Sequence, residues 1–200
     1  MSDPIDFYFD FSSPYGYLAS HEIDALAAKH GRSVSWRPYL MGVAMKQSGA
    51  KPLTERPLID AYAARDFARS ARKLAIPFVM PDTFPVGPVA ACRAYYWLHD
   101  VDADKAKGLA RGLYAAYFAH NRNIADAEVV LECAGAAGAD RKALAEGMQS
   151  QPVKDRLRAE TEAAIARGVF GSPFFIIDDE PFWGHDRLPQ VDAWLQSGGW

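Results

Sequence analysis

The chain has 200 residues, half of them hydrophobic and 24% charged, which is the composition of an ordinary globular protein with enough apolar surface for one or two cores. The formal net charge of -3 provides no basic surface for nucleic acid, and no apolar run approaches the roughly 20 residues that span a bilayer. We therefore expect neither nucleic-acid nor membrane partners. The acidic first residues lack the basic start of a secretory signal, so we expect a cytoplasmic protein.

The first predicted elements form a strand-helix-strand unit. Apolar and polar residues alternate over residues 5–11, which is the period of a strand. Apolar residues then recur every three or four positions over residues 15–27, Pro14 suits a first helical position, and residues 30–31 supply a helix stop. Residues 34–38 follow as a second short strand. Because a helix connects the two strands, we expect them to be parallel.

Strand signals disappear between residues 40 and 168. The stretch 40–58 mixes Gly42, Gly49, Pro52 and Pro57 with apolar residues, and we expect an irregular connection there. Alanine-rich stretches with helical spacing follow, each bounded by breaker or capping residues. The expected helices are 58–75, 88–99, 104–120, 126–138, 140–149 and 152–167.

The strand pattern returns after residue 168. Residues 174–177 and 181–183 are apolar runs separated by a short polar turn, which predicts a hairpin. A final amphipathic helix follows, with Asp186 as its predicted N-cap and Pro189 in its first turn.

The order of elements is βαβ, a helical block, then ββα. This order predicts an α/β fold in which a thioredoxin-like domain is interrupted by an all-α insertion. We expect residues 1–40 plus 169–200 to form the thioredoxin-like domain and residues 41–168 to form the insertion. Ligand sites in open α/β sheets lie beyond the carboxyl ends of strands, which here is the region of Ser13.

Ser13 stands where the first strand gives way to the first helix. A serine before a helix-starting proline ordinarily caps backbone N–H groups, and an isolated Ser-Pro supports no other role. A helix N-terminus also carries converging N–H donors and a partial positive charge, which favour an anion. No histidine–acid pair accompanies Ser13 in sequence, so its hydroxyl is better suited to donate to an external thiolate than to act as a nucleophile. Cys92 and Cys133 are expected to be buried free thiols, so the thiol would come from a bound cofactor.

Two further segments are candidates for ligand binding. The sequence Gly171-Ser172-Pro173-Phe174 places a proline before a strand that should be central. We expect a cis bond before Pro173, with the backbone N–H and C=O of Ser172 free to pair with a peptide-like ligand; the alternative is a trans bond and a plain strand start. Near the C-terminus, the Asp186 carboxylate can accept from the ammonium group of a ligand, as an alternative to capping.

The remaining charged residues suggest no further site. The other histidines share no helix face with a second ligand type, so we expect no metal. The basic residues Arg65, Arg69, Arg72 and Lys73 follow helical spacing and are most simply a solvated face, or alternatively a surface for an acidic substrate.

An ordered set of motifs resembles the 2-hydroxychromene-2-carboxylate isomerases and the related kappa-class glutathione transferases. The motifs are IDFYFDFSSPYGYLA at 5–19, VSWRPYLMG at 34–42, IPFVMP at 76–81, RGVFGSPFFI at 167–176 and FWGHDRL at 182–188. Together they span nearly the whole chain.

The resemblance implies a homodimer that binds glutathione between the thioredoxin-like domain and the insertion. It implies that Ser13 holds and activates the glutathione sulfur, that the backbone of Ser172 pairs with the cysteinyl unit, and that His185 with Asp186 receives the γ-glutamyl end. The positions that the resemblance assigns to glutathione are Ser13, Pro14, Tyr15, Ser172, Pro173, His185 and Asp186.

The chain departs from the family pattern at two positions. A Gly-Asn-Lys-Pro-like loop that reaches glutathione reads Gly-Ala-Lys-Pro at residues 49–52, so the asparagine contact is missing and Lys51 is the candidate to replace it. Ser172 stands where a larger apolar residue is more usual, although a contact through its backbone survives that change.

The resemblance implies a glutathione-dependent cis–trans isomerase that acts on a small aromatic carboxylate. Two alternatives remain open: a kappa-type glutathione transferase or peroxidase, and a non-catalytic binding protein on a degenerate thioredoxin scaffold. Aromatic placement alone suggests substrate contacts from Tyr62, Phe67, Phe84 or Trp97.

Overall fold

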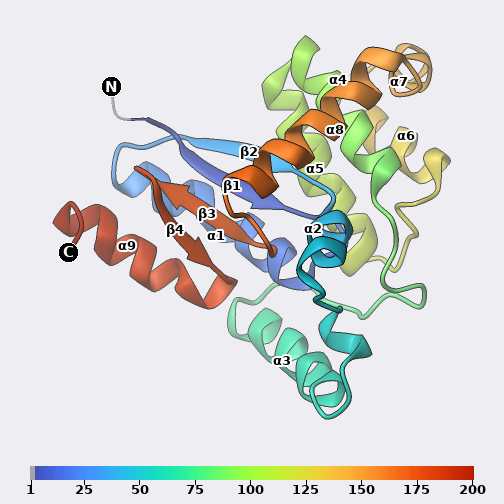
Figure 1. The fold of residues 1–200 in the computed structure, drawn as a ribbon. Helices are drawn as coiled ribbons and strands as arrows, with labels where there is room; N and C mark the ends of the chain where they lie inside the picture. The colour runs from blue at the N-terminus through green and yellow to red at the C-terminus, as the bar shows by residue number, and fades with distance from the viewer. Residues whose placement is uncertain (1–2) are drawn as a thin grey trace.

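A four-stranded mixed sheet lies at the centre of the computed structural model, which describes residues 3–200 (Figure 1). Its strands are β1 (Ile5–Phe9), β2 (Val34–Pro38), β3 (Phe174–Ile177) and β4 (Glu180–Trp183), in the order β2-β1-β3-β4. β1 and β2 are parallel, and β3 pairs antiparallel with both β1 and β4. The predicted parallel βαβ unit, the hairpin and the central place of the third strand are confirmed.

The alternation in β1 sends its side chains to two different cores. On one face, Phe7 stacks with Phe9 and Phe175, and it also meets the edge of Trp36. Helices α1 (Pro14–Lys29) and α9 (Leu188–Ser197) contribute apolar side chains to this larger core. On the other face, Tyr8 belongs to a smaller core that α2 (Met41–Ser48) and α8 (Gln151–Ala166) cover.

Every element that the structure describes between β2 and β3 is helical, as predicted. Besides α2 and α8, these are η1 (Leu53–Glu55), α3 (Asp60–Lys73), α4 (Val89–Val101), α5 (Ala103–Phe118), α6 (Ala127–Ala136) and α7 (Arg141–Gly147). The α4 hydroxyls of Tyr95 and Tyr96 donate to the carbonyls of Trp36 and Pro38 in the edge strand β2. The insertion therefore satisfies backbone groups that an edge strand would otherwise expose. Within residues 3–200, no helix is both long and apolar enough to cross a membrane.

Two local predictions are wrong. Residues 40–58 are not an irregular connection, because α2 and η1 lie there; Gly49, with a φ of 73°, ends α2, and Pro52 immediately precedes η1. The glycine and proline signals therefore mark helix boundaries. Asp186 does not cap the last helix either: the short helix η2 (His185–Arg187) precedes α9, and no side chain caps that helix. Pro189 does lie in its first turn, as expected.

Candidate active site at the start of helix α1

Ser13 occupies the N-cap of α1 and is almost fully buried, with 4% of its surface exposed. Its backbone is extended, and its Oγ accepts a hydrogen bond of 3.1 Å from the N–H of Gly16. Pro14 is the first helical residue, as predicted. Because α1 runs for 16 residues, its N-terminus carries a partial positive charge directed at this turn.

The hydroxyl of Ser13 also reaches the distant Ser172–Pro173 segment. The Ser172–Pro173 peptide bond is cis, as predicted. Ser13 Oγ donates to the carbonyl oxygen of Ser172 at 2.8 Å, so half of the expectation for Ser172 is wrong: its carbonyl is occupied. Its N–H makes no hydrogen bond within the part of the chain that the structure describes. Because the Ser13 hydroxyl has one proton to donate, any external acceptor at Ser13 would have to displace the Ser172 carbonyl.

The side chain of Ser172 explains why a small polar residue stands at this position. Its Oγ accepts from the buried N–H of Asp10 at 2.9 Å. A Cβ atom at Gly16 would lie 2.9 Å from this oxygen and 2.5 Å from the Tyr114 hydroxyl oxygen. The first turn of α1, the end of β1 and the segment before β3 are therefore in close contact, with no room for a larger side chain without movement.

Replacing Ser172 with alanine is expected to lower the free energy of unfolding by about 1–3 kcal/mol, because the buried N–H of Asp10 would lose its acceptor. Urea unfolding measures this change. Ser20→Ala is a matched control, since Ser20 is an equally buried serine of α1 that only donates to a carbonyl of its own helix, that of Tyr17. Equal stability of the two variants would contradict the prediction.

Asp10 is a functional candidate that the sequence analysis missed. It is buried, with 3% of its surface exposed. One carboxylate oxygen accepts from the N–H of Ser12 at 2.7 Å and the other from the N–H of Met41, at the start of α2, at 2.9 Å. Burial raises the pKa of this carboxyl to about 6, although both hydrogen bonds oppose the rise. The bond from Ser12 is a local aspartate turn, and that spacing was the one signal in the sequence.

Tyr15 connects the start of α1 to α3. Its hydroxyl donates to Asp66 at 2.5 Å, and its ring packs edge-on against Phe67. Burial, together with the hydrogen bond to Asp66, raises the pKa of Tyr15, so this hydroxyl stays protonated at neutral pH. Asp66 also pairs with Arg69 on the exposed side of α3.

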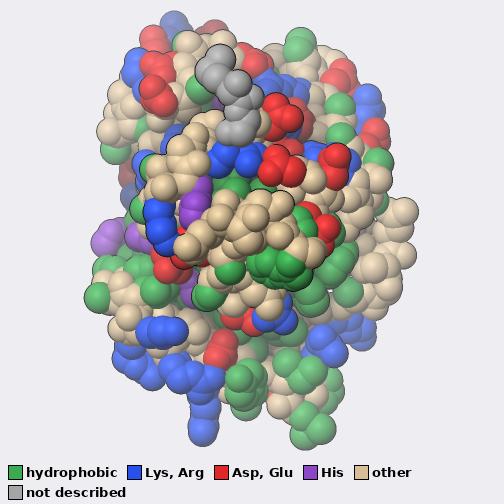
Figure 2. Space-filling view, turned by 90° about the vertical axis from the view of Figure 1, so that its left-hand side faces the viewer, with side chains coloured by type: hydrophobic (Ala, Val, Ile, Leu, Met, Phe, Trp, Pro, Cys, Tyr) green, Lys and Arg blue, Asp and Glu red, His purple; other side chains and the backbone are tan. Residues whose placement is uncertain are grey.

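The basic face predicted on α3 is present. Arg65, Arg69 and Arg72 line an open groove of about 440 Å³ along this helix. Figure 2 shows cationic side chains gathered at the lower end of the molecule, where α3 lies in Figure 1. The contact between Tyr15 and Asp66 joins this helix to the first turn of α1.

His185 and Asp186 have different surroundings. His185 Nε2 lies 2.6 Å from a carboxylate oxygen of Glu22, so this ring fastens η2 to α1. The side chain of Asp186 is 75% exposed and pairs only with its neighbour Arg187, at 3.1 Å, among the ion pairs of residues 3–200. The negative charge of Asp186 also contributes to the raised pKa of Tyr15, which indicates that it faces the same end of α1.

No interaction among residues 3–200 connects Lys51 to the turn that carries Ser13. It lies exposed in the loop between α2 and η1, and the hydrogen bonds and ion pairs of the described residues do not include its side chain.

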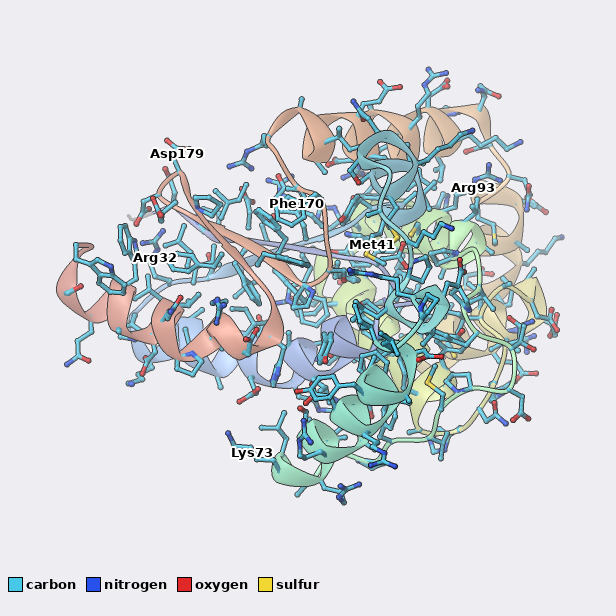
Figure 3. The ribbon with its side chains drawn as sticks, turned by 60° about the horizontal axis from the view of Figure 1, so that its bottom comes forward. Arg32, Met41, Lys73, Arg93, Phe170 and Asp179 are labelled. Carbon is cyan, nitrogen blue, oxygen red and sulfur yellow. The ribbon has the colours of Figure 1, made fainter. Side chains whose placement is uncertain are left out.

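Two aromatic side chains that the sequence analysis did not name lie exposed beside the cis proline. Phe67 is buried against Tyr15, whereas Phe170 and Trp183 are 46% and 55% exposed, with their rings 4.8 Å apart. The Trp183 indole covers Gly171, where a Cβ would lie 2.2 Å from its Nε1. Phe170 is labelled in Figure 3 in the segment that leads to Ser172.

The two cysteines are unsuited to thiolate chemistry. Cys92 is buried and Cys133 partly buried, and both are free. Burial raises the pKa of both thiols, so neither ionises readily at neutral pH. Within residues 3–200, no three histidine, cysteine, aspartate or glutamate side chains gather as metal ligands. A thiolate at Ser13 therefore has to come from a bound molecule.

Comparison with known proteins finds relatives that match along nearly the whole chain. The 2-hydroxychromene-2-carboxylate isomerase of Sphingobium xenophagum is 30% identical, covering 98% of this chain and 99% of that protein. Glutathione S-transferase kappa 1 of Homo sapiens is 26% identical, covering 92% and 87% respectively. A solved structure of a 2-hydroxychromene-2-carboxylate isomerase, 25% identical, superposes with a TM-score of 0.87 and covers 96% of this chain and 94% of that one.

The family model described as a DSBA-like thioredoxin domain matches residues 4–196, which is nearly the whole chain. The chain therefore belongs to the DSBA-like thioredoxin domain family, in the group that contains the 2-hydroxychromene-2-carboxylate isomerases.

Proposed function

We propose that this protein is a glutathione-dependent cis–trans isomerase that acts on an aromatic ring-fission product such as 2-hydroxychromene-2-carboxylate. The observation that carries the proposal is the position of Ser13: its hydroxyl lies at the N-terminus of α1, 2.8 Å from the carbonyl that precedes the cis proline. The names of the relatives, an isomerase and a glutathione S-transferase, support it. The same resemblance supports a homodimer.

The residues present fit glutathione. The N–H of Ser172, without a partner among the described residues, can donate to the backbone of a cysteinyl unit, and Pro173 lies next to it. The exposed carboxylate of Asp186 can accept from the γ-glutamyl ammonium, while His185 holds η2 against α1. Pro14 and Tyr15 complete the surroundings of the thiol in this proposal, and Lys51 is kept as the candidate to replace the missing asparagine contact.

Bound glutathione would supply a thiolate for reversible addition to the substrate double bond, which is the chemistry that cis–trans isomerisation needs. The chain contributes the surroundings of that sulfur. Ser13 would donate a hydrogen bond to it through its hydroxyl, and the partial positive charge at the start of α1 stabilises a negative charge there. The basic groove on α3 offers cations to a carboxylate substrate.

Purified protein is expected to isomerise 2-hydroxychromene-2-carboxylate only when glutathione is present, without net consumption of glutathione. Absorbance of the substrate follows the isomerisation, and a thiol assay at the end point measures the remaining glutathione. Glutathione consumption with formation of a conjugate would instead identify the transferase that the human relative suggests. Absence of turnover with either kind of substrate would leave the non-catalytic alternative.

A further inference from the structure

Asp10 contacts three segments around Ser13. Its carboxylate accepts from Ser12 N–H and Met41 N–H, at 2.7 and 2.9 Å. Its own N–H donates to Ser172 Oγ, and its carbonyl accepts from Ser13 N–H, both at 2.9 Å. One residue therefore fixes the turn that carries Ser13, the start of α2 and the segment before the cis proline.

The charge of Asp10 has no positive partner in the described part of the chain. The ion pairs of residues 3–200 do not include it, and only the two backbone N–H groups stabilise its carboxylate. The titratable groups that face it are neutral at pH 7: Tyr39 after β2, Cys92 in α4, and Tyr114 and Tyr117 in α5. Because burial raises its pKa only to about 6, Asp10 is mainly ionised at pH 7.

An anion beside Ser13 would therefore meet a second, uncompensated anion in the same buried region. Asp10 is three residues from Ser13 and accepts from its N–H, so the two negative charges would be close. Neighbouring like charges raise the pKa of an acid, so the Asp10 charge opposes ionisation while Ser13 and the helix N-terminus favour it. The observed arrangement is a balance of these opposing effects.

We propose that Asp10 is a positioning residue of the thiol site, and that its buried negative charge limits how strongly the site ionises a bound thiol. This inference rests on the proposed function. An isomerase needs a thiolate that adds to the substrate and also leaves it. The nucleophilicity of a thiolate falls as the pKa of its thiol falls, and the best attacking thiol has a pKa near the ambient pH. A site without the opposing charge would hold a more stable but less reactive thiolate.

The Asp10→Asn variant tests this inference. Asparagine keeps the shape and one acceptor oxygen but removes the charge, so the pKa of the bound thiol is expected to fall by about one. The pKa is measured by NMR titration of glutathione labelled with ¹³C in its cysteinyl unit, bound to wild-type protein or to the variant. If Asp10 had only a structural role, the pKa of the bound thiol would change in the opposite direction in the variant. A loosened Ser13 would stabilise the thiolate less, and this pKa would rise. An unchanged or raised pKa in the variant would overturn the inference.

Asp6→Asn is the matched control. Asp6 lies in β1, four residues before Asp10, but it pairs with Arg37 and Arg167, so the bound thiol is expected to keep its wild-type pKa. Should Asp10→Asn not fold, the carboxyl of Asp10 is titrated by NMR in wild-type protein, with and without glutathione. The two negative charges affect each other equally, so the pKa of Asp10 is expected to rise when the thiolate binds. No rise would overturn the inference. If labelled glutathione does not bind to wild-type protein, the proposed function itself fails.

Discussion

Replacing Ser13 with alanine is expected to reduce glutathione-stimulated turnover by about 10- to 100-fold at neutral pH, because a hydrogen bond to a charged group contributes about 1.5–3 kcal/mol. The variant retains the N–H groups at the start of α1 but loses the hydroxyl that now donates to Ser172. The pKa of the bound thiol is expected to rise, so less thiolate forms. Loss of the N-cap also lowers the free energy of unfolding by about 1 kcal/mol.

The pH dependence of the rate separates these two effects. At pH 9.5 glutathione ionises with little help, so the deficit of Ser13→Ala is expected to shrink, whereas a deficit from a frayed helix would remain at every pH above neutrality. Ser20→Ala removes a buried hydroxyl elsewhere in the same helix and is expected to retain wild-type activity. Wild-type turnover by Ser13→Ala at pH 7 would remove Ser13 from the mechanism.

Local patterns in the sequence were sufficient to predict most of the fold. The strand alternation of residues 5–11 and the change to helical spacing after Pro14 correspond to β1 and α1. The prediction of an irregular connection over residues 40–58 was wrong because α2 is only eight residues long, with Gly42 inside it and Gly49 at its end. A helix of two turns contains too few apolar positions to show a period, so its fold depends on packing against α8 and β1 that the sequence does not display.

The site was predictable only where its chemistry coincides with an element boundary. Ser13 and Pro173 stand at the start of α1 and immediately before β3, where the change of period draws attention to them. Asp10 looks like one more polar residue of an alternating strand. Its burial depends on Met41 and Ser172, which are 31 and 162 residues away in the chain. Trp183 was likewise assigned to a strand, and its position over Gly171 follows from the hairpin register.

Asp10 is expected to make the protein less stable at pH 7 than at pH 4 by about 2 kcal/mol, from this residue alone. The cause is its burial, which raises the pKa of the folded carboxyl from 3.8 to about 6. Between these values the folded protein keeps the proton that the unfolded chain has released. The folded state then binds more protons than the unfolded state, so its stability falls as pH rises through this window and becomes constant above it.

Asp10→Asn isolates this contribution, since the variant keeps every other titratable group. Urea unfolding, followed by tryptophan fluorescence at pH 4, 5, 6 and 7, gives the free energy of unfolding of both proteins. The wild-type value minus the variant value is expected to decrease by about 2 kcal/mol across the series, and most of the decrease should occur below pH 6. A constant difference would mean that Asp10 titrates alike in the folded and unfolded states. In that case its carboxylate would not carry the unfavourable buried charge from which we infer its influence on a thiol bound at Ser13.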